Sequence, residues 1–311
     1  MGTISSIANL VNGCAGGTVS TGKLGCNVQF GEPRHLIGLK AGLEILATET
    51  FDQAYINGLI QAGNAVPLIG ASSFEDMSSE DSVFTYSSGV ELQNLEGLPK
   101  YKLTFDEGHQ FYKEMSKLKG FKNLDFIIGD NEGNWKLVKK SNGNYKGFSA
   151  GQVLPMMVKN KVSGGDIESK AITVQLTNRL EYDTNYDILL RSNLDNDPED
   201  FNGVNAVSLA FSVVPSNLDT TLVVSTLLDA DRKTVVEGMI VSDFLVTVDG
   251  ATITPSLLTE ANGVYTLTIA ALATAEVVTV QLYDSSVNKN VIISTSGDLF
   301  RSNILNATVI A

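Results

Sequence analysis

The side chains that could do chemistry in this sequence are few and widely spaced. The only histidines are His35 and His109, and the only cysteines are Cys14 and Cys26. Cys14, Cys26 and His35, with Glu32 nearby, suggest a zinc site at first sight. Their C-x11-C-x8-H spacing, however, is not that of a known zinc finger. We therefore expect no metal site, and the cysteine pair stays open between a disulfide and two reduced thiols.

The nucleophile and phosphate motifs are also incomplete. No serine stands in a G-x-S-x-G elbow, and two histidines leave little material for a catalytic triad. Gly17 and Gly22-Lys23 keep the spacing of a phosphate-binding loop, but Leu24 stands where the metal-binding hydroxyl belongs. We expect no catalytic residue, no cofactor and no enzyme, with a carboxylate-based hydrolase as the remaining enzymatic hypothesis.

The acidic runs "SFEDMSSED" (73–81) and "DNDPED" (195–200) are typical of solvated loops. Acid–base catalysis would need paired carboxylates in a desolvated cleft. The net charge of −13 argues against binding nucleic acid through its phosphates. No window approaches the ~18 consecutive apolar residues of a membrane span, and the first residues lack a signal-peptide pattern. These features predict a protein made in a cytoplasm, with no membrane partner.

The elements expected to position any site are mostly strands. The pattern predicts one firm helix over 106–119, with Thr104 or Asp106 as its N-cap. Two turn sequences, "DNEG" and "SNGN", then separate three alternating runs, as in consecutive hairpins. A helical segment is also expected within 36–63. The polar, acidic segment 71–89 predicts either a long loop or a protruding hairpin.

The chain is expected to form two domains, 1–213 and 216–311, each with its own core. The strand-like run at 204–214 is assigned to the first domain. Beyond it, short β-branched runs recur every 10–15 residues or so, which favours a small sandwich that folds alone. The fold class is mainly β: an α+β domain with an antiparallel sheet or sandwich and one firm helix, followed by a β-sandwich. Trp135 is interpreted as core packing, with a contact anchor as the alternative.

Charge is distributed in blocks along the chain. Residues 100–170 hold 13 bases and 8 acids, whereas residues 1–99 hold 10 acids and 3 bases. This predicts either a solvated surface or complementary faces that steer self-association. The candidate assembly contacts are Lys113, Lys117, Lys136, Lys139, Lys140, Glu75, Asp76, Glu80 and Asp81. Several of the lysines among them are expected to be exposed.

Two stretches carry a resemblance to known proteins. Residues 234–284, "TVVEGMIVSDFLVTVDGATITPSLLTEANGVYTLTIAALATAEVVTVQLYD", are similar to bacterial Ig-like modules found on surface proteins and on phage virion proteins. "FIIGDNEGNWKLVKKSNGNYKGFSAG" with "AITVQLTNRLEYDTN" resembles structural proteins of tailed phages that infect Bacteroidetes, in the style of a tail-tube protomer. The resemblance implies an Ig-like second domain and a virion role, and it carries over no catalytic residue.

The first hypothesis is thus a virion protein, made in the host cytoplasm, that forms a tail tube or tube-like ring. Its partners would be copies of itself in a ring or shell, with six subunits as one arrangement, and other virion proteins. An acidic lining would let DNA pass without adhering. The alternative is a capsid or tail adhesin whose Ig-like domain contacts the host or glycans.

Overall fold

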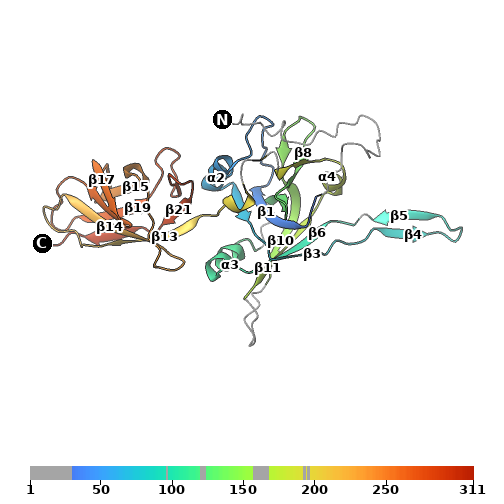
Figure 1. Cartoon of the computed structure of the whole chain (residues 1–311), viewed down its shortest axis with the longest axis horizontal. Helices are drawn as coiled ribbons and strands as arrows, with labels where there is room; N and C mark the ends of the chain where they lie inside the picture. Colours follow the sequence, from blue (N-terminus) through green and yellow to red (C-terminus); the bar gives the residue numbers. More distant parts are fainter. Residues whose placement is uncertain (1–29, 96, 120–123, 157–167, 192–193, 195–196) are drawn as a thin grey trace. The chain divides into compact units, whose positions relative to one another are not determined.

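A computed structural model describes residues 30–95, 97–119, 124–156, 168–191, 194 and 197–311 (Figure 1). The chain is mainly β. Its contacts divide it into unit 1, Met1–Ile56 with Asn64–Phe201, and unit 2, Asn57–Gly63 with Asn202–Ala311. Both cysteines and the glycine-rich segment around them lie outside the described residues. Within the described ranges, no helix is long and apolar enough to cross a membrane.

Unit 1 is built on antiparallel strands. They are β1 (Pro33–Lys40), β2 (Ala65–Leu68), β3 (Ser73–Asp76), β4 (Ser82–Thr85), β5 (Glu91–Leu95), β6 (Lys100–Phe105), β7 (Leu124–Asp130), β8 (Trp135–Lys139), β9 (Tyr145–Lys146), β10 (Phe148–Pro155), β11 (Lys170–Leu176) and β12 (Tyr186–Leu189). The main sheet runs β12-β8-β7-β10-β11-β6-β3, with β1, β2 and β9 paired beside it, and β4 and β5 pair only with each other. Its described helices are α3 (His109–Ser116), α4 (Arg179–Asp183) and the 3-10 turn η2 (Pro198–Asp200), together with the start of α2 (Gln53–Gln61), which belongs to unit 2 from Asn57 on.

The consecutive hairpins lie where the turn sequences predict them. Gly133 and Gly143 both have positive φ, 84° and 87°, the conformation that such turns need. On β11, Ile172, Val174 and Leu176 are at most 1% exposed and face the core beneath α3. Alternation therefore predicted the inward face of β11 correctly, although Ala171 and Thr173 on its other face are buried as well.

The central strands are buried on both faces. Every residue of β7 is buried. Trp135 of β8 is 0% exposed, and its ring lies 5.9 Å from Phe51 and 5.5 Å from Phe201. These aromatic rings form a second apolar cluster, so Trp135 serves the core rather than a surface contact.

Two local predictions are wrong. Residues 36–40, expected within a helical segment, belong to β1, which pairs with β2 and β7. Their short apolar run is buried on both faces, a case that periodicity alone does not separate from a helix. The firm helix begins at His109 rather than 106, and its N-cap is Gly108, with no side-chain cap.

The segment 71–89 forms a protruding hairpin rather than a structureless loop. After β3 pairs with β6, the chain leaves the sheet, forms β4 and β5, and returns to β6. Figure 1 shows β4 and β5 extending away from the other strands of unit 1. We call residues 80–95 the arm.

Unit 2 is a β-sandwich of two sheets. Its strands are β13 (Asn205–Phe211), β14 (Thr221–Leu228), β15 (Phe244–Val248), β16 (Ala251–Ile253), β17 (Leu257–Ala261), β18 (Val264–Thr268), β19 (Val277–Leu282), β20 (Ile292–Ile293), β21 (Leu299–Ser302) and β22 (Leu305–Thr308), with the 3-10 turn η3 (Val241–Asp243). One sheet runs β17-β18-β14-β13-β21-β20 and the other β16-β15-β19-β22. Val224, Tyr265, Val246 and Val280, each 0% exposed, pack between them.

The boundary between the units differs from the predicted one. β13, assigned from sequence to the first domain, pairs with β14 and β21 in the middle of a unit 2 sheet. The division therefore falls after Phe201 and not near Pro215. The strand pattern at 204–214 was recognised correctly, but its partners lie downstream, and β21 is almost a hundred residues away.

Candidate assembly surface

The arm is a regular two-stranded hairpin. Phe84 lies opposite Leu92 and Thr85 opposite Glu91. At the tip, the Tyr86 amide donates to the Val90 carbonyl at 2.8 Å. Gly89, at φ 79°, closes this turn in the left-handed conformation that favours glycine.

The arm exposes large apolar side chains along its length. Phe84, Tyr86 and Val90 are 54%, 48% and 55% exposed. Phe84 and Tyr86 are two residues apart on one strand, so they share a face, and their rings meet edge to face at 5.0 Å. Val83, on the opposite face, is 52% exposed. Both faces of the hairpin therefore carry apolar surface that the described residues do not cover.

The root of the arm is fixed to the body of unit 1. Arg179 Nη1 donates to the Asp81 carboxylate and, at 3.1 Å, to the Gly97 carbonyl, so one guanidinium joins both strands. The Asp81 carboxylate also accepts from the Gly97 amide at 2.8 Å. A Cβ on Gly97 would lie 1.8 Å from the Ser79 carbonyl oxygen, so only glycine allows this approach.

Arg179 was not identified from the sequence. Asn178 caps α4 by accepting from the Leu180 amide, and Arg179 pairs with Asp183 at 2.7 Å along the same short helix. The local sequence indicates that i,i+4 pair. Its partner Asp81 lies almost a hundred residues away, and no local pattern could indicate that contact.

Lys136 is not an exposed assembly contact. It is 6% exposed, and its Nζ lies 3.6 Å and 3.8 Å from the ring centres of Tyr182 and Tyr186. Burial lowers its pKa to about 8, although nearby Asp183 acts in the opposite direction. The choice of Lys136 as a contact is wrong because α4 and β12 place Tyr182 and Tyr186 over its ammonium.

Most of the other predicted contacts have partners within the chain. The ion pairs are Lys117–Glu114 at 2.6 Å, Lys139–Asp187 at 2.9 Å, Glu75–Lys102 at 2.7 Å, Lys140–Glu44 and Asp81–Arg179. Asp76 is exposed and accepts from the Ser78 amide at 2.9 Å. Lys113 and Glu80 are exposed and form no ion pair with another described residue.

This pairing leaves the basic block with little spare charge. Ten of its lysines are described, and five of them are in ion pairs: Lys102, Lys117, Lys139, Lys140 and Lys146. Lys136 and Lys170 are buried, and Lys170 Nζ donates to the Tyr112 carbonyl of α3 at 3.1 Å. Of the described lysines of the block, Lys100, Lys113 and Lys119 remain. Lys113 lies on α3 and Lys119 just beyond it, and both are exposed.

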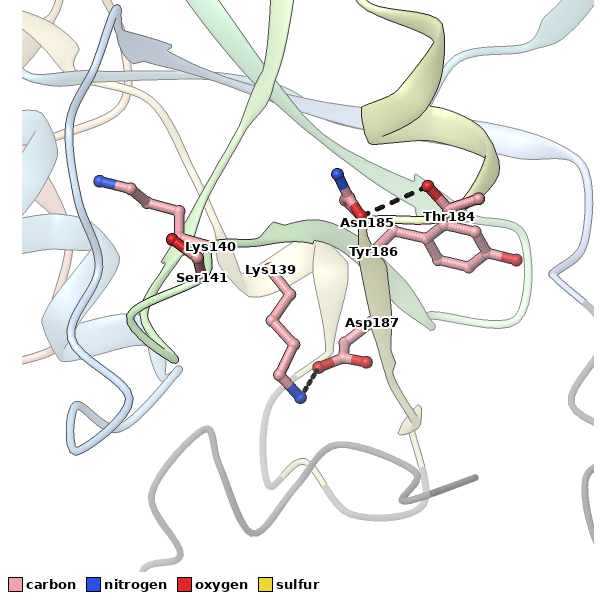
Figure 2. Close-up of a pocket in the computed structure, with 7 residues that line it drawn as sticks. All are labelled: Lys139, Lys140, Ser141, Thr184, Asn185, Tyr186 and Asp187. Atoms are coloured by element: carbon pink, nitrogen blue, oxygen red, sulfur yellow. Dashed lines mark hydrogen bonds and ion pairs between the residues drawn. The ribbon is translucent and has the colours of Figure 1, made fainter. Parts of the chain in front are cut away.

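A shallow hollow of about 330 Å³ lies beside two of the predicted contacts, Lys139 and Lys140. Figure 2 shows the Lys139 ammonium turned to Asp187, while Thr184 and Asn185 are hydrogen-bonded to each other at 3.3 Å. Lys140 pairs with Glu44, which also accepts from Asn142 Nδ2 at 2.6 Å. The lysines that line this hollow are thus already neutralised within the chain.

Glu44 is strongly held in its charged form. The hydrogen bond from Lys140, followed by those from Asn144 and Asn142, lowers its pKa to about 2. These groups fix the SNGN turn against the loop after β1. This cluster of polar contacts therefore has a structural role.

A second hollow, about 400 Å³, lies at the root of the arm between Asp76, Glu80, Asp183 and Arg179. The described ranges contain no group of three or more His, Cys, Asp or Glu arranged to hold a metal ion. Of the two histidines, His109 is an exposed residue at the start of α3, 3.6 Å from Glu168. His35 is buried, and its Nδ1 accepts from the Gly70 amide at 3.1 Å.

Comparison with known proteins gives little further guidance. No protein family model matches the sequence, and no curated protein matches it. Among solved structures, the mouse nectin-like molecule 4 ectodomain (Ig1–Ig3) aligns over 90% of this chain and 95% of its own, at 9% identity and a TM-score of 0.18.

Proposed function

We propose that this protein is a structural protomer that assembles with copies of itself. The observation that carries the proposal is the arm, a hairpin fixed at its root and exposing Phe84, Tyr86 and Val90 at its far end. Isolated two-stranded hairpins are marginal in water, and exposed aromatic side chains clustered on one element mark interaction sites. An assembly would cover this surface.

We further propose that the assembly is part of a tailed-phage virion, with a tail tube or tube-like ring as its form. The sequence resemblance of residues 126–151 and 171–185 to phage structural proteins supports this step. The net charge of −13 suits a protein past which DNA moves without adhering. Copies of the chain and other virion proteins would be its partners, and no enzymatic activity is part of the proposal.

The proposal is tested by imaging and by sedimentation of the purified chain. We expect closed rings or short tubes of uniform diameter in negative-stain micrographs, with a sedimentation coefficient that rises with protein concentration. A chain that stays monomeric at all concentrations and binds polysaccharide in a pull-down would contradict it. That result would favour an adhesin acting through unit 2.

A further inference from the structure

The arm is unusual in charge as well as in exposure. The arm holds Glu80, Asp81 and Glu91 and no basic residue, and Asp81 is paired with Arg179 at its root. Two such arms would repel each other, because like charges would meet wherever the hairpins paired. The surface that receives the arm therefore has to be basic.

The exposed face of α3 has that character. Lys113 and Lys119 are exposed and have no ion pair among the described residues, and Lys117 is held only by a surface pair with Glu114. Lysine suits both features of the arm. Its ammonium attracts carboxylates and the faces of aromatic rings, and its aliphatic stem covers apolar surface.

The arm and α3 lie at opposite ends of one strand. β6 begins at Lys100, just after the arm returns to the sheet, and ends at Phe105, just before α3. Its six residues span ~20 Å at about 3.3 Å per residue. Both ends are anchored. Arg179 holds the arm, while Tyr112 Oη donates to the Phe105 carbonyl at 3.2 Å and to the Glu168 carbonyl at 2.7 Å.

We propose that the arm of one copy docks on the lysine face of α3 of a second copy. The inference rests on the proposed function and names the two surfaces that meet. In a head-to-tail arrangement the contact is heterologous, because each copy uses its arm toward one neighbour and its α3 face toward the other. Repeating it adds copies head to tail, which closes into a ring or continues as a filament.

The test exchanges the charges of the two surfaces. The arm variant carries Glu80→Lys and Glu91→Lys, and the helix variant carries Lys113→Glu and Lys119→Glu. Each alone places like charges together, and we expect at least a ~tenfold loss of association measured by sedimentation, equivalent to one decade in Kd. A chain carrying all four substitutions restores opposite charges and should assemble again. A mixture of the two variants should also assemble, with the variants alternating, since both arm–helix contacts between unlike copies are attractive.

A matched control is Lys40→Glu with Lys233→Glu, which makes the same charge change at two exposed lysines that belong neither to α3 nor to the arm. It should assemble like the wild type. Circular dichroism of each variant at low concentration should show an unchanged fold. Association of the wild type should also weaken as salt approaches 1 M, where the screening length falls to ~3 Å.

The outcomes separate this inference from the function on which it rests. If the wild type assembles and the two charge variants do so equally well, or if the four-fold variant is not restored, the docking site is wrong and self-assembly stands. If the wild type itself never associates, both proposals fail. Restored assembly of the variant with all four substitutions, together with a control that assembles like the wild type, would support the docking site.

Discussion

Two hairpins of unit 1 have similar local chemistry and opposite environments. The β7–β8 hairpin turns at a glycine of positive φ and buries every residue of β7 together with Trp135, which is 0% exposed. The arm also turns at a glycine of positive φ, yet residues 80–90 are all exposed, with Phe84 at 54%. The same kind of local structure thus stabilises the monomer in one case and is left for a partner in the other.

The difference can be expressed as free energy. Full burial of a large apolar side chain contributes about 1.5–3 kcal/mol relative to leaving it exposed. The β7–β8 hairpin gains this burial free energy for Trp135 and its neighbours. The arm gains little of it within the chain, and its position relies on the polar contacts of Arg179 at its root. Changes in the two hairpins should therefore affect different measurements.

The largest expected effect comes from removing a strand whose partners lie inside its own unit. A fragment of residues 202–311 retains β13 between β14 and β21, whereas a fragment of residues 216–311 lacks it. We expect cooperative thermal unfolding and dispersed NMR spectra for the longer fragment only, because the shorter one leaves two strand edges and the core facing water. Equal folding of both would show that β13 is dispensable and that the sequence-based boundary was adequate.

A side chain in each hairpin gives the direct comparison. Trp135→Ala should lower the free energy of unfolding by ~3–5 kcal/mol, since it opens a cavity among buried rings. Phe84→Ala should change it by no more than ~0.5 kcal/mol in the monomer. Urea titrations at low protein concentration measure both. A large loss for Phe84→Ala would mean that the arm packs on its own chain.

Lys136 tests whether a charged residue in the buried hairpin weakens it. Its folded-state pKa of about 8 lies below the ordinary value, so the folded state loses its proton first as pH rises. The free energy of unfolding should therefore rise above pH 8, by at most ~1.4 kcal/mol per pH unit, until the unfolded chain also loses the proton.

The variant Lys136→Met should lose this rise between pH 8 and 9.5, whereas Lys139→Met, at the exposed end of the same strand, should keep it. Identical slopes in the two variants would mean that Lys136 stays charged beneath Tyr182 and Tyr186 over this range. The cation–π contacts would then outweigh the desolvation.

The smallest expected effect concerns His35. Burial lowers the pKa of His35, against smaller opposing effects of Asp130 and Asp197, while Arg34 lowers it further. A group with a lowered folded-state pKa contributes stability that is present above its ordinary value of about 6.5 and is lost as pH falls below it. Protonation would also turn Nδ1 from an acceptor into a second donor facing the Gly70 amide.

We expect His35→Gln to reduce the loss of stability between pH 6.5 and 5 by ~1 kcal/mol or less. The matched control is His109→Gln, the same substitution at an exposed site. If neither substitution alters the acid branch, the carboxylates alone account for it.

The parts of the fold that the sequence predicted correctly are those that local chemistry determines. The DNEG and SNGN turns place Gly133 and Gly143, and alternation places the inward face of β11. The failures involve distant residues. β13 was assigned to the wrong unit because the sequence pattern of a strand does not indicate which other strands it pairs with. Lys136 was placed on the surface because the tyrosines that cover it lie more than forty residues further along the chain.

The assembly surface was predictable to the same limited extent. Length and polarity indicated a protruding segment at 71–89. Its acidic residues favoured a solvated loop, so the exposed aromatic rings near the tip were not identified from the sequence. The charge blocks suggested complementary faces. Most of those charges are paired within the chain, and two of the pairs, Lys140–Glu44 and Arg179–Asp81, join residues 96 and 98 positions apart. Only α3 and its end retain exposed lysines of the described block without a pair.

The most direct test of the central claim is sedimentation velocity on the wild type and on a chain without the arm. Gly97 lies against the Ser79 backbone, so residues 80–96 can be replaced by an Asn-Gly turn that joins the two strands at the root. We predict that the wild type forms a concentration-dependent oligomer, and that the shortened chain keeps its circular dichroism and its thermal unfolding but sediments as a monomer. A shortened chain that assembles as readily as the wild type would contradict the account.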